Sequence, residues 1–297
     1  MAGLGRSSHP PRRSVLFLPG TNARAQEKAR ELPADALILD LEDSVAPDAK
    51  LAARTQIAAS LRAGGYGKRE LVLRVNGAET PWQDDDLRFA AHLPIAAVLL
   101  PKVDGPDDVL SAEAMLAGAG LEHRMPLWAM MEVPLAFMRA EAIASSTPHL
   151  RALVMGTEDL GKDLRTRVMP DRSTLMTALQ ICVLAARAHG LDPLDSVSPD
   201  FKDLDAFTAA CRQGRDLGFA GKTLIHPNQI APANTAFAPN VEEIAAAQRV
   251  VEAYAAAKAD GRAVASLDGR MIEQLHADTA QHVLDLGTAI AALSADH

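Results

Sequence analysis

The chain of 297 residues has a formal net charge of −8, and 48% of its residues are hydrophobic while 23% are charged. This balance is typical of a globular protein with a sizeable core and excludes a disordered chain. No apolar run is long enough to span a bilayer, and no basic patch with interleaved aromatic residues occurs, so neither a membrane nor a nucleic acid is expected as a partner.

Short apolar runs alternate with amphipathic stretches, and the runs are continuous, as strands buried on both faces of a parallel sheet require. Eight strands are predicted, at residues 15–18, 36–41, 71–75, 96–100, 127–131, 153–155, 194–197 and 222–225. Helical segments are predicted between them, at residues 22–32, 48–63, 82–91, 107–117, 135–146, 173–189 and 204–217. This repeat predicts a TIM (β/α)8 barrel. The alternative is an open, doubly wound sheet, but no glycine-rich dinucleotide motif follows the first strand.

The C-terminal region exceeds what a barrel needs. The pattern predicts an alanine-rich helix at 241–258, a loop at 259–268 and a last helix at 271–293. We therefore expect a flexible tail at 1–12, the barrel at 13–238 and a C-terminal helical extension at 239–297. Two roles are open for the extension: contact with another subunit, or a lid over the chain's own barrel.

The chain has two cysteines, Cys182 and Cys211, and neither has the spacing of a metal ligand. Both are expected to be buried thiols, which suits a reducing compartment. The first 13 residues are polar and basic, without the apolar core of a secretion signal. These features predict a cytoplasmic protein.

Two carboxylates follow adjacent predicted strands, Glu132 after the fifth and Asp159 after the sixth. In a parallel barrel the carboxyl ends of the strands meet on one face, so these side chains should converge. Two oxygen ligands without a nearby His or Cys suit a hard cation such as Mg2+, with Mn2+ as a possible substitute. The alternative for each is a helix N-cap or a surface acid.

Further charged residues stand at other strand ends. Arg74 interrupts an apolar strand, so it either holds a substrate carboxylate through its planar fork or pairs with Asp40 or Glu42. Asp40, Glu42 and Asp43 place three acids within four positions, and Lys102 is a further partner for them. We expect this group to support the metal site rather than ligate the ion, because more carboxylates would overcharge one Mg2+.

Six segments, taken in order, resemble the citrate lyase beta-subunit-like family of the HpcH/HpaI aldolase/citrate lyase superfamily. They are RSVLFLPG at 13–20, LDLEDSV at 39–45, LRVN at 73–76, LPKV at 100–103, GTEDL at 156–160 and KTLIHP at 222–227. The resemblance covers roughly residue 12 to the C-terminus. It implies a Mg2+-dependent carbon–carbon lyase of the TIM-barrel class. Its substrates would be malyl-CoA-, citramalyl-CoA- or citryl-type thioesters, split into acetyl-CoA or propionyl-CoA and a 2-oxo acid.

The resemblance also implies roles for individual residues. The family's metal ligands fall on Glu132 and Asp159, and its substrate-carboxylate arginine falls on Arg74. Gly156 and Thr157 fall at the substrate site. A basic residue of the first helix contacts coenzyme A in some members, and the candidates for it are Arg24 and Lys28.

One segment departs from the family. In its oligomeric lyases, an Asp in a Met-Ile-Asp segment reaches a neighbouring subunit's site as acid/base, whereas this chain has Met271-Ile272-Glu273. Either Glu273 is an adapted acid/base or the reaction differs, and Asp268 is a second candidate. The resemblance thus implies a homo-oligomer, a trimer or hexamer. Two other functions stay open: a malyl-CoA-type thioesterase, and a citrate lyase beta subunit that acts on a carrier-bound citryl thioester.

Overall fold

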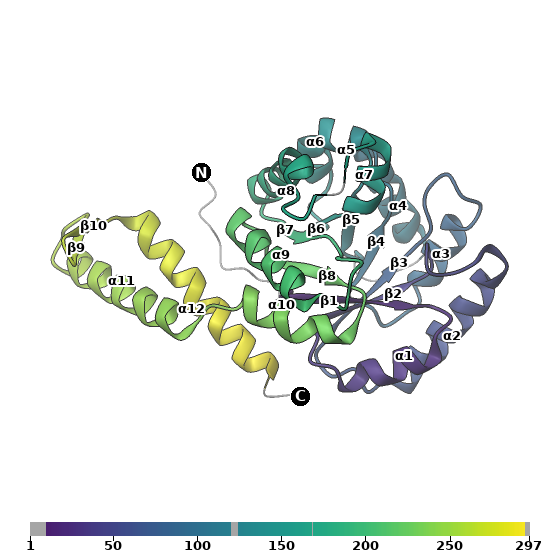
Figure 1. Cartoon of the computed structure of the whole chain (residues 1–297), viewed down its shortest axis with the longest axis horizontal. Helices are drawn as coiled ribbons and strands as arrows, with labels where there is room; N and C mark the ends of the chain where they lie inside the picture. The colour runs from purple at the N-terminus through teal and green to yellow at the C-terminus, as the bar shows by residue number, and fades with distance from the viewer. Residues whose placement is uncertain (1–9, 120–123, 168, 295–297) are drawn as a thin grey trace. The chain divides into compact units, whose positions relative to one another are not determined.

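The predicted barrel is confirmed by a computed structural model, which describes residues 10–119, 124–167 and 169–294 (Figure 1). Eight parallel strands close in the order β1 to β8, and β8 pairs with β1. They are β1 Ser14–Pro19, β2 Ala36–Asp40, β3 Glu70–Arg74, β4 Ala97–Leu100, β5 Leu127–Met131, β6 Leu150–Met155, β7 Asp192–Asp195 and β8 Gly221–Leu224.

Helices follow every strand and surround the barrel (Figure 1). They are α1 Ala23–Lys28, α2 Lys50–Ala63, α3 Gln83–Ala90, α4 Pro106–Gly118, α5 Pro134–Met138, α6 Ala140–Ala144, α7 Thr157–Leu164, α8 Met176–Ala188, α9 Leu204–Leu217 and α10 Ile230–Phe237. Short 3-10 turns, at Ala29–Glu31, Pro47–Ala49, Ser173–Leu175 and Pro227–Gln229, complete the connections.

The strands are apolar on both faces, as their continuous hydrophobic runs predict. One buried cluster, which includes Ile38, Val72 and Trp128, fills the barrel interior. A larger cluster, which includes Leu37 and Leu73, lies between the strands and the surrounding helices. The two clusters account for the apolar character of both faces of the strands.

The seventh strand begins and ends two residues earlier than predicted, and its ends are acidic. Asp192 pairs with Arg12 at 2.7 Å, and Asp195 pairs with Arg172 at 2.7 Å and with Lys222 at 3.2 Å. Paired in this way, carboxylates can be buried in a strand at a tolerable cost. Because its ends are acidic, the apolar pattern predicts this strand with its bounds shifted by two residues.

The amino end of the barrel is closed by ion pairs. Arg12, the last residue of the predicted tail, also pairs with Glu70 at 2.7 Å, and its guanidinium lies 4.7 Å from the ring centre of Trp128. Next to it, Arg13 donates two hydrogen bonds of 2.8 Å to the carboxylate of Asp35. These contacts hold the barrel shut at the end opposite the predicted site.

The C-terminal region contributes to a second compact unit, and the barrel unit covers residues 12–237. Two long helices, α11 Val241–Ala259 and α12 Gln274–Ser294, pack side by side (Figure 1). Between them, β9 Ala265–Leu267 and β10 Arg270–Ile272 form an antiparallel hairpin. No helix in the three described ranges is both long and apolar enough to cross a membrane.

The hairpin corrects two expectations, because residues 265–272 are neither a loop nor the start of the last helix. Its turn is Asp268-Gly269, and both residues have positive φ, 49° and 76°. An Asp-Gly pair is a strong signal for a tight hairpin turn. That signal was present in the sequence, but three-residue strands are too short to show alternation.

Candidate metal and substrate site

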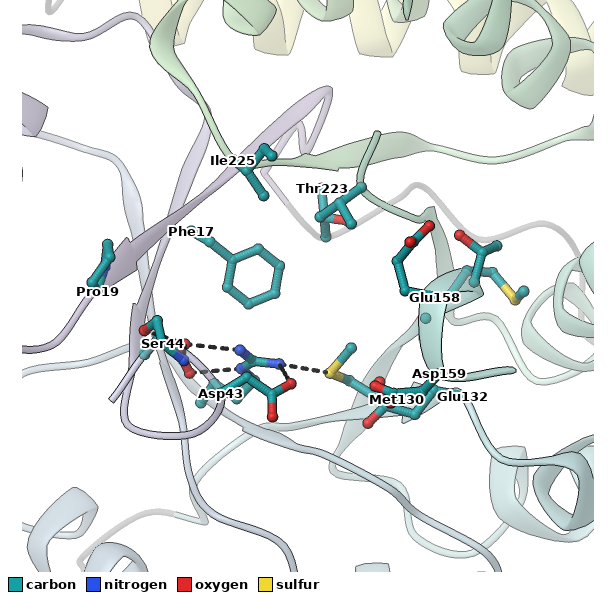
Figure 2. Close-up of a pocket in the computed structure, with 16 residues that line it drawn as sticks. Phe17, Pro19, Asp43, Ser44, Met130, Glu132, Glu158, Asp159, Thr223 and Ile225 are labelled. Atoms are coloured by element: carbon teal, nitrogen blue, oxygen red, sulfur yellow. Dashed lines mark hydrogen bonds and ion pairs between the residues drawn. The ribbon is translucent and has the colours of Figure 1, made fainter. Parts of the chain in front are cut away.

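A cavity of about 400 Å³ opens at the carboxyl ends of the strands. Described residues at or just after the ends of every strand except β4 line it. Figure 2 shows Phe17, Asp43 and Ser44 on one side of the cavity, and Glu132 with Asp159 on the other. The strand-end rule thus brings the predicted metal ligands into one cavity.

Glu132 follows β5 and is 2% exposed. The backbone N–H of Lys102 donates to its Oε1 at 2.7 Å. Burial raises the pKa of Glu132 to about 7, and the nearby Glu42 carboxylate adds to this effect, while the Lys102 hydrogen bond opposes it. A buried carboxylate of this kind gains stability when a cation neutralises it.

Asp159 lies in the first turn of α7, three residues after Gly156, and its charge raises the pKa of Glu132 further. A Cβ at Gly156 would lie 2.5 Å from Oε2 of Glu132, so this carboxylate occupies the space that a side chain would take. Two carboxylates from neighbouring strand ends, one of them buried, fit a hard divalent cation. Within the described ranges, no cluster of three or more His, Cys, Asp or Glu is arranged for a metal.

The raised pKa predicts how metal affinity depends on pH. Because Glu132 must be ionised to bind a cation, protons compete with Mg2+ below its pKa of about 7. We expect the affinity to fall by about tenfold for each pH unit below about 7 and to level off above it. Calorimetric Mg2+ titrations at about pH 6 and about pH 8, with circular dichroism as a control for folding, measure this. Equal affinities at the two pH values would contradict the expectation.

Arg74, at the end of β3, forms a two-pronged pair with Asp40, from Nε at 2.7 Å and Nη2 at 2.8 Å. Its Nη1 contacts Sδ of Met130 at 3.8 Å and lies 2.7 Å from Glu42, and Phe17 stacks on the guanidinium. Burial would raise the pKa of Asp40, but the charge and hydrogen bonds of Arg74 hold that pKa below its usual range. The structural pairing therefore occurs, and of the five N–H groups of Arg74 only the second one on Nη2 has no partner among the contacts above.

Lys102, Glu42 and Asp43 form a group of ion pairs next to Arg74. The Lys102 ammonium contacts the Glu42 carboxylate and lies 3.7 Å from Asp43. Asp43 also lies 3.6 Å from Nη1 of Arg74 and lines the cavity. Ion pairs with the two cations thus hold the acids in place, which agrees with a supporting role.

Thr157 also lines the cavity, and its hydroxyl donates to the Ser196 hydroxyl at 2.8 Å. Sequence reasoning missed Ser196 as a site residue, because it placed residue 196 inside the seventh strand, whereas Ser196 directly follows β7. It also missed the cavity residues Ser44, Glu158 and Thr223. The rule that found Glu132 could have found Thr223, at the end of β8, but a hydroxyl at a strand end is a weaker signal than an acid.

Besides Glu42 and Lys102, four predicted residues do not line the cavity. Arg24 and Lys28 are exposed on α1. Asp268 and Glu273 belong to the second unit. Asp268 pairs with Arg249 at 2.5 Å.

Glu273 immediately precedes α12, and its carbonyl accepts the N–H of His276 at 3.0 Å. This position corrects the expected start of the last helix. Among the described residues, no hydrogen bond or ion pair engages the Glu273 carboxylate.

Comparisons with known proteins identify the family. Residues 13–227 match the family model of the HpcH/HpaI aldolase/citrate lyase family. Over 285 residues the chain is 46% identical to a (3S)-malyl-CoA thioesterase of Cereibacter sphaeroides, covering 96% of this chain and 98% of that protein. It is 36% identical to citrate lyase subunit beta of Escherichia coli, covering 95% of both.

Among solved structures, the chain resembles protein CitE from Mycobacterium tuberculosis in complex with magnesium, acetoacetate and coenzyme A. The TM-score is 0.76 and the identity is 28%, over 95% of this chain and 99% of that one.

Proposed function

The chain belongs to the HpcH/HpaI aldolase/citrate lyase family, and on this premise we propose that it is a Mg2+-dependent carbon–carbon lyase acting on a malyl-CoA- or citramalyl-CoA-type thioester. The observation that carries the proposal is the convergence of Glu132, Asp159 and Arg74 on one cavity. A dication beside an arginine is what a 2-oxo acid, with its adjacent carbonyl and carboxylate oxygens, requires.

In the proposed mechanism, Glu132 and Asp159 hold the Mg2+, which supplies Lewis-acid polarisation of the 2-oxo carbonyl when bound. Arg74 binds the substrate carboxylate and balances the negative charge that develops on the oxygen. A base takes the hydroxyl proton as the carbon–carbon bond breaks. The acyl-CoA carbon that receives the electron pair is then protonated. The space over Gly156 and Thr157 admits the acid portion, and Arg24 and Lys28 are the proposed contacts for coenzyme A.

Thioester hydrolysis is the second candidate. The observation that favours it is the 46% identity, over nearly the full length of both chains, to a protein named malyl-CoA thioesterase. In this reaction water attacks the thioester carbonyl, and the products are free CoA and the dicarboxylic acid. Binding of the acid portion by Arg74 and the cation would be common to both reactions.

One assay distinguishes the candidates. The protein is incubated with malyl-CoA, citramalyl-CoA and Mg2+, and both the free thiol and the 2-oxo acid are measured. Release of a 2-oxo acid without thiol supports the lyase, and thiol without 2-oxo acid supports the hydrolase. If neither thioester yields free thiol or a 2-oxo acid, the proposed substrate class is refuted. The same chain with Asp159→Ala is the control for contaminating activity.

We also propose that Glu273 acts as the acid/base in the site of a neighbouring subunit of a homo-oligomer. Mixing inactive Asp159→Ala and Glu273→Ala chains should then restore part of the activity, because some sites receive an intact residue from each chain. The matched control mixes Asp159→Ala with the Asp159→Ala/Glu273→Ala double variant, which cannot build a complete site. No recovery in verified mixed oligomers would refute the cross-subunit role.

A further inference from the structure

Lys102 has a backbone conformation that an L-residue adopts only at an energetic cost. Its φ is +52°, in the left-handed region, and it directly follows Pro101 after β4. Among the described residues, three other non-glycine residues have positive φ, and none of them lines the cavity or contacts Glu132. Such strain persists where the surroundings impose it, commonly at functional sites.

The strained backbone has one clear effect on the site. It directs the N–H of Lys102 to Oε1 of Glu132, at 2.7 Å. The other oxygen, Oε2, lies over Gly156, where a side chain would collide with it at 2.5 Å. One oxygen of Glu132 is therefore engaged by the backbone, and the other remains for a ligand.

The side chain of Lys102 has a separate task. Its ammonium contacts the Glu42 carboxylate, which lies against Arg74. The backbone of Lys102 thus contacts the proposed metal ligand Glu132, while its ammonium contacts the carboxylate that pairs with Arg74.

We propose that Lys102 is a positioning residue whose left-handed backbone, and not its charge, sets the metal affinity, by leaving Glu132 a single free oxygen for the cation. This inference rests on the metal site of the proposed function. It assigns to the backbone conformation a role that the residue's charge does not suggest.

The test compares Lys102→Gly with Lys102→Val. Both variants remove the ammonium and keep the N–H group, but glycine adopts positive φ freely, whereas a β-branched residue resists it strongly. Mn2+ is titrated into substrate-free protein and the affinity is read by electron paramagnetic resonance. We expect Lys102→Gly to stay within about threefold of the wild type. Lys102→Val should lose at least about tenfold, as changes in groups that orient metal ligands do.

Each result decides the inference. Equal losses in both variants would assign the effect to the ammonium, and unchanged affinity in both would show that the conformation is irrelevant; either overturns the inference. If Lys102→Val does not fold, Lys102→Thr, which is also β-branched, replaces it, and the same loss of at least about tenfold is expected. A wild type without Mn2+ affinity would refute the metal role itself along with the inference. If the wild type binds Mn2+ and both variants bind it equally well, only the inference is refuted and the metal role stands.

Discussion

Replacing Asp159 by alanine should lower metal-dependent turnover by about three orders of magnitude, because it removes one of the two protein ligands of the proposed Mg2+ site. The fold should survive. Asp159 is partly exposed in the first turn of α7, and its carboxylate makes no hydrogen bond or ion pair with another described residue. Turnover at saturating Mg2+ and calorimetric metal affinity measure the effect.

Asp163→Ala is the matched control for this variant. Asp163 is the same residue type on the same helix, is exposed, and does not line the cavity. It should retain both metal affinity and turnover. Normal Mg2+ affinity in Asp159→Ala would show that the ligand assignment is wrong.

Arg74→Lys should lower kcat/KM toward the thioester. The loss corresponds to about 1.5–3 kcal/mol of transition-state binding free energy, in the range of hydrogen bonds to charged groups. Lysine keeps the positive charge but cannot hold Asp40 with two parallel N–H groups and present a further N–H to a substrate carboxylate. Steady-state kinetics and binding of pyruvate or glyoxylate measure the loss.

Arg13→Lys is the control that separates a loss of protein stability from a loss of substrate binding. Arg13 forms the same two-pronged pair with an aspartate, Asp35, at the opposite end of the barrel. Both variants should lower the free energy of unfolding, but only Arg74→Lys should change kcat/KM. Equal kcat/KM values in the two variants would show that Arg74 does not bind the substrate.

The fold could be predicted because most strands are apolar on both faces, and because strand ends of a parallel barrel share one face. That rule placed Glu132 and Asp159 in one cavity without knowledge of any contact. The apolar pattern placed β7 two residues too late, because its buried acids Asp192 and Asp195 depend on partners distant in sequence.

Other features depend on three-dimensional context that a single chain pattern does not contain. The pairing of Arg74 with Asp40 was one of two alternatives, and the choice depended on side-chain distances. The positive φ of Lys102 has no sequence signal, since lysine is a poor candidate for that conformation. The hairpin at residues 265–272 had a signal, Asp268-Gly269, but its strands are three residues long.

Closure of the barrel between its first and last strands has a consequence for synthesis of the chain. Ser14 of β1 lies beside Lys222 of β8, so these partners leave the ribosome roughly 200 residues apart. At elongation rates of about 5–20 residues per second, the free edge of β1 waits roughly 10–40 s for its partner. An unpaired strand edge is a template for association with other nascent chains. Chaperones and proteases therefore encounter the nascent chain first as an open sheet. A truncated product that ends before Gly221 lacks β8 and keeps the edge of β1 unpaired.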